Sequence, residues 1–321
     1  MDTFVHSRVL RIVARRVALA IPLLLAVSAV TFVLVSLTPG NPVAEILGPY
    51  SSPAARQALA RTLALNLPVY EQYWRWLEHA VTGNVGISVV SGESVTSEIG
   101  QRIGVTLWLS VGSILASVVV GGALGIFSAL RGGPLARAVD GVALLGFALP
   151  AYWVGAELIV LFAVDVHWFP ATGYVSPSVS IAHWLRSLVL PVAALSLYGV
   201  AAIAKQTREA MLDALASEYI RMARANGIPR RSIVLRHALR NASINVVTVL
   251  GVIAVGLLGG TVLAETVFSL PGLGSLMVSS AEQHDLPVVQ ALAVLFTAMV
   301  VVINLVIDLA YVALNPRMSV G

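Results

Sequence analysis

The 321-residue sequence contains no cysteine and little charge. Without cysteine, the chain cannot form a disulfide, a thiolate metal site or a cysteine nucleophile. Charged residues make up only 11% of the chain, well below the share of about a quarter that is usual for a soluble domain. Because hydrophobic residues reach 58%, the composition predicts a membrane protein.

Lysine is almost absent as well. The single lysine, Lys205, is followed by Gln206, so the sequence has no Gly-Lys-Ser/Thr phosphate loop. It also has no His/Glu zinc spacing and no Gly-x-Ser-x-Gly nucleophile elbow. We therefore expect no catalytic residue, no metal site, no bound cofactor and no ATP hydrolysis by this chain alone. The net charge of +4 follows from membrane topology and requires no nucleic acid partner.

Long apolar runs predict an all-α membrane protein with six transmembrane helices. Each run approaches or exceeds the length that crosses about 30 Å of hydrocarbon. Fifteen basic residues fall on one side of the predicted membrane and five on the other, so the positive-inside rule puts both termini in the cytoplasm. The first run is too long for a signal peptide and is interpreted as a retained span. The predicted spans are 12–37, 105–130, 139–163, 188–204, 243–267 and 287–313, with the fourth the shortest.

The spans divide the chain into four segments. These are a cytoplasmic arm with the first helix (1–37), an extracytoplasmic cap (38–101), a five-helix transmembrane domain (102–313) and a cytoplasmic tail (314–321). The cap is too long for a simple turn. It contains a predicted helix at 70–82, whose aromatic side chains either anchor it at the membrane interface or contact a partner or substrate.

Glycine and proline inside the spans predict close contacts and bends. The pairs Gly121-xxx-Gly125 and Gly256-xxx-Gly260 allow two helices to approach closely. Prolines inside membrane helices are tolerated where the helix bends and neighbours supply hydrogen bonds. We expect bends at Pro22, Pro150 and Pro191.

The loop at 205–242 is the most basic part of the chain. The stretch from Lys205 to Asn245 holds eight of the twenty lysine and arginine residues. Within it, 219–227 is predicted to form a short helix that Gly227 ends and Pro229 prevents from continuing. Its helical spacing aligns Tyr219, Met222, Ala223 and Asn226. A second helical pattern follows, with Leu235, Ala238, Leu239 and Ala242 on one face. A short helix that projects into the cytosol is suited to bind another protein.

This loop carries a resemblance to a known family. The segments Tyr219-Ile-Arg-Met-Ala-Arg-Ala-Asn-Gly-Ile and His237-Ala-Leu-Arg-Asn-Ala242 resemble the cytoplasmic EAA loop of ABC importer permeases, in the version of the dipeptide/oligopeptide permease family. Asn245 stands where that family usually has proline. Further blocks match in order: Pro39-Gly-Asn-Pro42, Leu67-Pro-Val-Tyr-Glu-Gln-Tyr73, Gly83-Asn-Val-Gly-Ile-Ser88, Glu265-Thr-Val-Phe-Ser-Leu-Pro-Gly-Leu-Gly274 with Asp285-Leu-Pro287, and Asn304-Leu-Val-Ile-Asp308 with Asn315-Pro316-Arg317.

The resemblance implies a type I ABC importer permease fold, with an outer cap after the first helix, in the bacterial cytoplasmic membrane. It implies import of dipeptides or oligopeptides driven by separate cytoplasmic ATPase subunits, which bind ATP and Mg. Further implied partners are a second homologous permease subunit, an extracytoplasmic solute-binding protein and the lipid bilayer. Nickel, glutathione or haem-like cargo stays open, because the external protein largely chooses the solute.

The resemblance also assigns candidate site residues. In the family, the EAA loop contains the coupling helix, which sits in a groove of the ATPase. The implied coupling residues are Tyr219, Arg221, Met222, Ala223, Arg224, Ala225, Gly227, His237, Arg240 and Asn241. The family's loop after the fifth span lies near the transport path, which makes Glu265, Pro271, Gly272 and Gly274 path or gate candidates. Glu157 is added to them as a carboxylate inside the third span.

The carboxylates inside the spans leave open an alternative to an ABC importer subunit, namely a transporter driven by protons. Inserting a charge at the centre of a membrane helix costs about 2.5–3.5 kcal/mol. Each carboxylate inside a span is therefore expected to have a structural or functional role. Glu265 and Asp308 lie near span ends and fit an interfacial structural role, whereas Glu157 either faces the path or bonds a neighbouring helix. A proton-coupled secondary transporter could use these three carboxylates as a relay. The sequence lacks the paired repeats typical of such transporters, and a coupling loop would have no purpose there.

Overall fold

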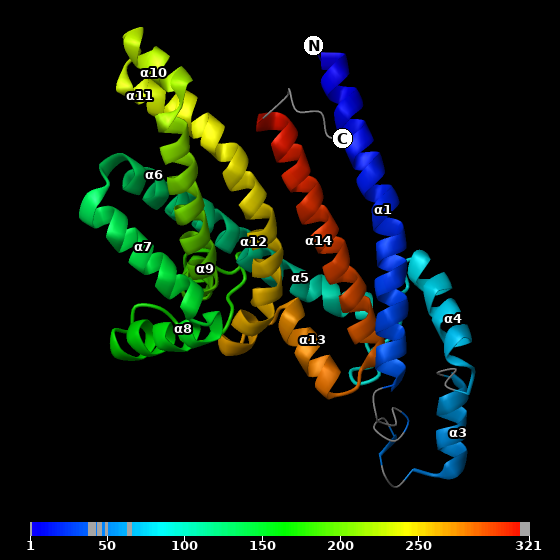
Figure 1. The fold of residues 1–321 in the computed structure, drawn as a ribbon. Helices are drawn as coiled ribbons and strands as arrows, with labels where there is room; N and C mark the ends of the chain where they lie inside the picture. Colours follow the sequence, from blue (N-terminus) through cyan, green and yellow to red (C-terminus); the bar gives the residue numbers. More distant parts are fainter. Residues whose placement is uncertain (1, 38–42, 44–46, 49–50, 63–65, 315–321) are drawn as a thin grey trace. The chain divides into compact units, whose positions relative to one another are not determined.

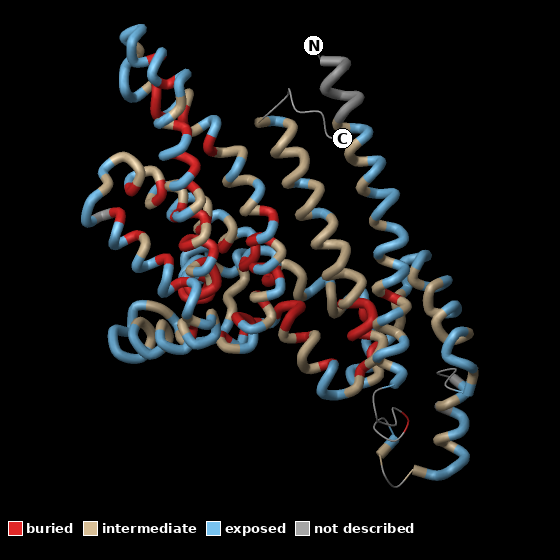
Figure 2. Tube along the Cα trace, in the orientation of Figure 1, coloured by how far each residue is buried: buried red, intermediate tan, exposed pale blue. Residues whose placement is uncertain are grey.

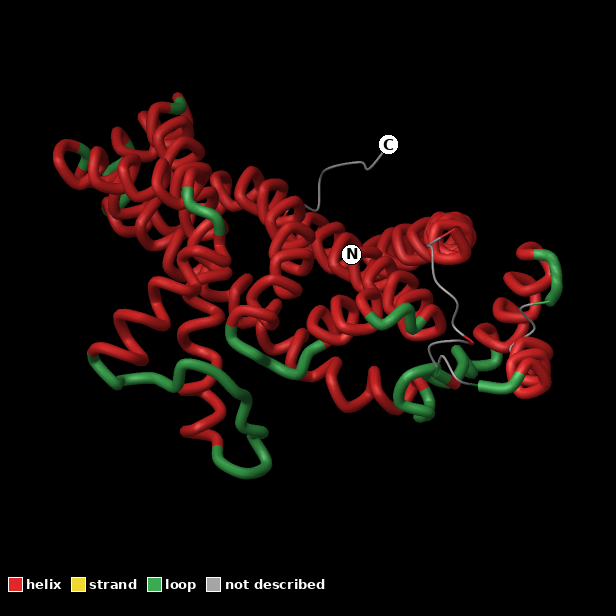
Figure 3. Tube along the Cα trace, turned by 90° about the horizontal axis from the view of Figure 1, so that it is seen from below, coloured by secondary structure: helices red, strands yellow, loops and turns green. Residues whose placement is uncertain are grey.

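The computed structural model describes residues 2–37, 43, 47–48, 51–62 and 66–314. Helices joined by loops make up most of that part of the chain (Figure 3), and its one bridge between extended residues joins Ile87 and Ser94. In chain order the helices are α1 (Asp2–Leu37), α3 (Pro53–Thr62), α4 (Val69–Val81), α5 (Val95–Ala116), the π-helical turn η1 (Ser117–Gly121), α6 (Gly122–Arg131), α7 (Gly133–Ala148), α8 (Ala151–Leu158), η2 (Ile159–Asp165), α9 (Ile181–Ala216), α10 (Glu218–Ala225), α11 (Arg230–Ser232), η3 (Ile233–Ala238), α12 (Leu239–Val267), α13 (Leu273–Glu282) and α14 (Leu286–Leu314) (Figure 1).

The described helices match the predicted spans in order. Five helical stretches are long and apolar enough to cross a membrane: Val9–Leu37, Val95–Arg131, Ile181–Ala216, Arg230–Val267 and Leu286–Leu314. A sixth crossing is counted when the bent pair Ala136–Ala148 and Ala151–Asp165 is taken as one span. The predicted all-α membrane fold is therefore confirmed. The motif at 39–42, the motif at 315–317 and the tail from 315 onward lie outside the described residues.

The third predicted span, 139–163, is broken rather than gently bent. Its two halves meet at an angle of 105°. Leu149 is extended, with φ −90° and ψ 126°, because a following proline disfavours the helical conformation. Pro150 is the extended N-cap residue just before α8, a position at which its missing N–H breaks no helical hydrogen bond. The bend expected at Pro150 is confirmed, and it is sharp enough to separate α7 from α8.

The fourth predicted span, 188–204, is much shorter than the helix that contains it. α9 has 36 residues. It begins at Ser180, whose hydroxyl accepts a hydrogen bond from the His183 N–H at 3.4 Å, as an N-cap does. It continues past 204 because Thr207, Met211 and Ala214 are buried against neighbouring elements. Residues 205–216, which the sequence analysis placed in the cytoplasmic loop, therefore belong to α9.

One compact unit comprises described residues 2–14, 105–271 and 302–314. Its central element is α9, which contacts α12, α6, α7 and α8, and Figure 2 shows buried residues concentrated along it. The packing is close enough that Gly125 has no room for a side chain. A Cβ there would lie 2.6 Å from both the Ala204 carbonyl oxygen and the Thr207 Cβ.

The two small-residue pairs behave differently in this unit. Gly121 packs like Gly125, since a Cβ there would lie 2.7 Å from the Val200 carbonyl oxygen. In the second pair, Gly260 faces Leu195 of α9, whereas a Cβ on Gly256 would meet no atom within 4 Å. The close contact predicted for the first pair is therefore confirmed. For the second pair it holds for one glycine only.

A second compact unit comprises described residues 15–104 and 272–301. Its core joins Val95 of α5, Leu273 and Leu276 of α13, and Val288 and Leu292 of α14. This core fixes the N-terminal ends of α5, α13 and α14 to one another.

The cap helix predicted at 70–82 is α4, which packs on α1 within this second unit. The Tyr73 hydroxyl and the Ser28 hydroxyl share a hydrogen bond of 2.9 Å, and the Tyr73 ring meets Phe32 edge-on with centroids 5.6 Å apart. Tyr73 thus anchors the helix to its own chain. Tyr70 and Trp74 stay exposed, so contact with the membrane interface or a partner remains a prediction for these two.

Candidate functional site

The short helix predicted in the basic loop is present as α10. A turn at Ser217 separates it from α9, and Gly227 ends it in the left-handed conformation with φ +72°. The Gly227 N–H donates to the Arg224 carbonyl at 3.0 Å, and the Ile228 N–H to the Ala223 carbonyl at 3.1 Å. This pair of bonds is a Schellman closure, which satisfies the last carbonyls of the helix and favours glycine at the left-handed residue. The stop predicted at Gly227 is confirmed.

The two sides of α10 have different surroundings. Ile220 and Ala223 are buried in a cluster with Ile233. Met222 is 67% exposed and Tyr219 is 41% exposed. The prediction that Tyr219, Met222 and Ala223 share one exposed apolar face is therefore wrong for Ala223, which is buried. Because the helix must bury an apolar side against its own chain, Ala223 faces inward with Ile220, a residue that the sequence analysis did not single out.

The outward side of α10 combines apolar and basic groups. Tyr219 and Met222 lie on it, together with the exposed Arg221, Arg224 and Ala225. Such a surface suits a partner groove with an apolar floor and acidic groups at its rim.

The second helical pattern of the loop is also shifted from its predicted face. Val234, Ala238 and Ala242 are buried against Ala210, Met211 and Ala214 of α9, while Leu235 is 59% exposed. The reason is the π-helical turn η3, whose i→i+5 hydrogen bonds widen the turn and change which side chains face inward. Leu235, predicted on the apolar face, instead lies at the surface near the start of α12.

The remaining coupling candidates lie around this junction. The Asn241 side-chain amide donates to the Tyr219 hydroxyl at 3.2 Å, which links α10 to α12. His237 Nδ1 lies 3.1 Å from the Ser232 carbonyl oxygen, a contact within the loop itself. Arg240 is exposed. The structure thus brings Tyr219 and Asn241 together and leaves Arg240 on the surface.

A pocket of about 430 Å³ opens beside α10. Its apolar wall comes from the ends of α6 and α9 and from η3, and its basic groups are Arg224 and Arg230. The pocket is a positively charged recess beside α10, and its lining includes Ile228 and Ile233, which pack with the inward side of that helix.

At the other end of α12, Glu265 is completely buried. Its carboxylate accepts a hydrogen bond of 2.6 Å from the Thr106 hydroxyl of α5. Burying a carboxylate is costly unless hydrogen bonds compensate, so the pair indicates a brace between the two helices. The side chain is enclosed within its own chain and does not line an open path in this structure.

The loop that follows α12 closes on itself through the same motif as α10. The Leu270 N–H donates to the Glu265 carbonyl at 2.8 Å, and Ser269 takes a left-handed conformation with φ +51°. A residue other than glycine in this conformation is uncommon and strained. Of the gate candidates, Pro271 is exposed, whereas Gly272 and Gly274 are buried.

Glu157, the remaining path candidate, is exposed on α8. It makes no hydrogen bond with any described residue, and it is not brought together with Glu265. Its role in a path stays a prediction.

An ion pair that no sequence motif indicated joins α7 to α9. Arg208 Nη1 lies 2.7 Å from Asp140 Oδ1 and 2.8 Å from Asp140 Oδ2. The two residues are 68 positions apart in sequence, so only the folded arrangement of the helices reveals the contact.

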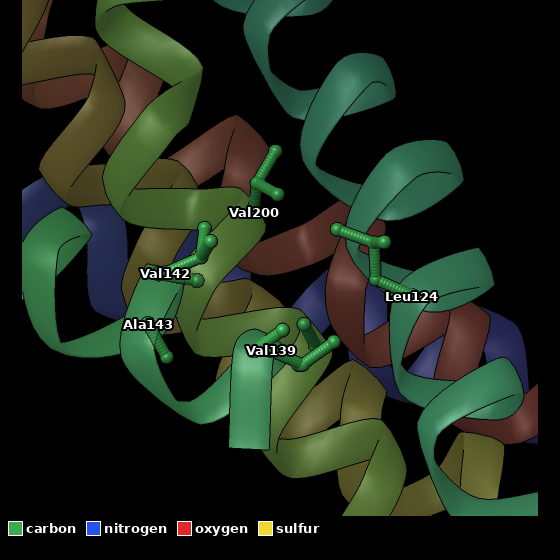
Figure 4. A pocket seen from close by; sticks show the side chains of 8 residues that line it. Leu124, Val139, Val142, Ala143 and Val200 are labelled. Carbon is green, nitrogen blue, oxygen red and sulfur yellow. The ribbon is translucent and has the colours of Figure 1, made fainter. Parts of the chain in front are cut away.

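A second pocket, of about 150 Å³, lies among α6, α7 and α9. Figure 4 shows Leu124, Val139, Val142, Ala143 and Val200 around it. All of its lining side chains are alanine, valine or leucine. Because a peptide needs hydrogen-bond partners for its backbone, this pocket is unsuited to bind one.

Two family models match consecutive parts of the chain. Residues 121–320 match the family described as binding-protein-dependent transport system inner membrane component. Residues 9–110 match the N-terminal membrane component of such systems.

Curated relatives cover almost the whole chain. A probable peptide ABC transporter permease protein of Sinorhizobium fredii is 37% identical over 306 residues, which span 95% of this chain and 98% of the relative. A putative peptide transport system permease protein of Brucella abortus is 37% identical over 95% of this chain and 98% of its own length. The glutathione transport system permease protein GsiC of Escherichia coli is 38% identical over 96% of this chain and 98% of its own length.

A solved structure supports the fold. An inward-facing crystal form of the MetNI methionine ABC transporter matches with a TM-score of 0.55, covering 68% of this chain and 96% of that chain. The identity of 19% means that this likeness shows the fold alone. Taken with the family match over 121–320 and the full-length relatives, it shows that the chain belongs to the family of binding-protein-dependent transport system inner membrane components, the multi-pass permease subunits of ABC importers in the bacterial inner membrane.

Proposed function

We propose that this permease subunit carries short peptides, dipeptides or oligopeptides, inward across the bacterial inner membrane. The observation that carries the proposal is the near full-length likeness to permeases named for peptide transport. ATP and Mg bind to separate cytoplasmic ATPase subunits, and the permease itself is not an enzyme. An extracytoplasmic solute-binding protein delivers the cargo.

The coupling step runs through α10. Its outward side, with Tyr219 and Met222, docks in a groove of the ATPase, and Arg221 and Arg224 pair with acidic groups at the rim. Ile220 and Ala223 hold the helix on the cytoplasmic ends of α9 and η3, so a displacement of α10 must move these elements with it.

α12 conveys that displacement toward the outer side. The bond between Asn241 and Tyr219 ties the cytoplasmic end of α12 to α10. With 29 residues and 1.5 Å per residue, α12 is about 44 Å long. Its far end carries Glu265 and the strained loop at Ser269. A rigid helix of this length can link the ATPase to the outer gate.

The peptide path lies between this chain and a second, homologous permease subunit. Within the described residues, the apolar pocket among α6, α7 and α9 offers no hydrogen-bonding side chain. We propose that the third and fifth spans line one wall of the path. The second subunit contributes the opposite wall.

Glutathione is the second candidate cargo, because GsiC is 38% identical to this chain over nearly its whole length. Uptake of a radiolabelled dipeptide, glutathione and Ni²⁺ should be compared in cells with and without the gene for this chain. We expect deletion to remove uptake of the dipeptide alone, and a plasmid-borne copy to restore it. If deletion removed only the uptake of glutathione, or only that of Ni²⁺, the cargo would be that compound and the peptide proposal would be wrong.

A further inference from the structure

The recess beside α10 is lined by side chains of two kinds. Its volume is about 430 Å³, and six of its lining residues are apolar, while Arg224 and Arg230 are basic. We call it the basic recess. Because apolar surface favours apolar atoms and a guanidinium favours an anion, a ligand that fills the recess must carry an apolar part and an anionic part together.

The two arginines of the basic recess have no partner of opposite charge in the part of the chain that the structure describes. Neither guanidinium forms an ion pair or a hydrogen bond with a described residue, and both arginines are exposed. The acidic residues closest to them in sequence, Asp213 and Glu218, do not line the recess. The charge of the two arginines is therefore available to an external anion, and a planar guanidinium can bind two phosphate oxygens at once.

The apolar wall of the basic recess lies where helices leave the membrane. Three of the candidate spans, Val95–Arg131, Ile181–Ala216 and Arg230–Val267, have their predicted cytoplasmic ends at the recess. Leu130 and Leu215 line it from the last turns of the first two. Since the second predicted span ends at Leu130, the wall reaches the inner boundary of the hydrocarbon.

The arginines of the basic recess lie on the cytosolic side of that wall. Both belong to the predicted cytoplasmic loop, and Figure 1 shows α10 and α11 past the turn between α6 and α7. A phospholipid has the same arrangement, with its acyl chains in the hydrocarbon and its phosphate outside, and basic pockets between membrane helices on this side suit anionic headgroups. A soluble anion such as inorganic phosphate would pair with the arginines but leave the apolar wall in water, so the lining favours the lipid.

We propose that the basic recess binds one anionic phospholipid of the cytoplasmic leaflet, with the headgroup phosphate at Arg224 and Arg230 and an acyl chain along Leu130. Arg224 belongs to α10, and Ile228 and Ile233 join the recess to the cluster that holds this helix. A bound lipid therefore braces α10 from its inward side. The site does not depend on which solute the permease carries.

The test labels the complete complex in proteoliposomes with a photoactivatable phosphatidylglycerol, whose reactive group lies next to the phosphate, and locates the label by mass spectrometry. We expect label within residues 129–130 and 228–234. Excess unlabelled phosphatidylglycerol should remove it, whereas excess phosphatidylethanolamine or millimolar inorganic phosphate should not. Arg230→Gln should reduce this labelling about fivefold, the loss expected when one basic residue near an anionic membrane surface is removed.

Arg231→Gln is the matched control, because it removes the same charge from the next residue, which is exposed and does not line the recess. We expect it to keep full labelling, and Arg230→Lys, which retains the charge, to keep most of it. Equal labelling in Arg230→Gln and Arg231→Gln would overturn the proposal, as would the absence of label from the recess of the unaltered complex. Displacement of the label by inorganic phosphate would also overturn it, by assigning the recess to a soluble anion. Loss of the ATPase subunits from the Arg230→Gln complex with unchanged labelling would do the same, by assigning the recess to the ATPase interface.

Discussion

Replacing Met222 by glutamate is expected to release the ATPase subunits from the purified complex while the permease still inserts in the membrane. Met222 is 67% exposed on α10, so the change leaves the inward cluster of Ile220, Ala223 and Ile233 intact. In a groove of the ATPase, the new carboxylate would be desolvated without a partner. Loss of a central interface contact of this kind costs about 2 kcal/mol or more, which corresponds to more than tenfold weaker association.

The measurement is the amount of ATPase recovered with an affinity-tagged permease from solubilised membranes, normalised to the permease. Met222→Leu is the control, because it keeps an apolar side chain of similar size and should retain the ATPase. Full recovery of the ATPase with Met222→Glu, together with normal peptide-stimulated hydrolysis, would show that α10 does not dock as proposed.

The second large effect is expected from Gly125→Ala, in the interface between α6 and α9. The added methyl would lie 2.6 Å from the Ala204 carbonyl oxygen and the Thr207 Cβ, so the two helices must move apart. Overpacking of this kind typically destabilises a protein by about 1–3 kcal/mol. We expect a lower midpoint of thermal unfolding and a smaller yield of monodisperse permease in detergent.

Gly256→Ala provides the matched control for that experiment. A Cβ at Gly256 meets no atom within 4 Å, and alanine is the better helix former by about 1 kcal/mol. The permease expressed alone should therefore keep or slightly raise its unfolding midpoint. Equal midpoints for Gly125→Ala and Gly256→Ala would contradict the close helix contact.

Much of this architecture could be predicted from the sequence, because it depends on local patterns. The lengths of the apolar runs predicted the five unbroken spans. The positions of Gly227 and Pro229 predicted where α10 ends. The break at Leu149 and Pro150 was also indicated, since proline restricts the residue before it. Its angle of 105° was not, because the direction of the next helix depends on packing.

The inward side of α10 could not be predicted, because its amphipathic pattern admits two interpretations. Tyr219, Met222 and Ala223 share a helical spacing, and so do Ile220 and Ala223. Only the position of Ile233, brought close by the turn at Gly227, decides that Ala223 is buried. The contact of Asp140 with Arg208 was missed for a related reason. It joins residues 68 positions apart in the chain and forms no motif.

The most direct test of the coupling role uses the absence of cysteine from the natural sequence. Single cysteines introduced by Met222→Cys and Ala223→Cys give two unique crosslinking positions that are neighbours in sequence, one exposed on α10 and the other buried against the chain itself. In the assembled complex, treated with a short thiol crosslinker, we predict that the cysteine at 222 joins the permease to an ATPase subunit and that the cysteine at 223 does not. Crosslinking at 223 but not at 222, or at neither position in a complex that retains its ATPase, would contradict the assignment of α10 as the coupling helix.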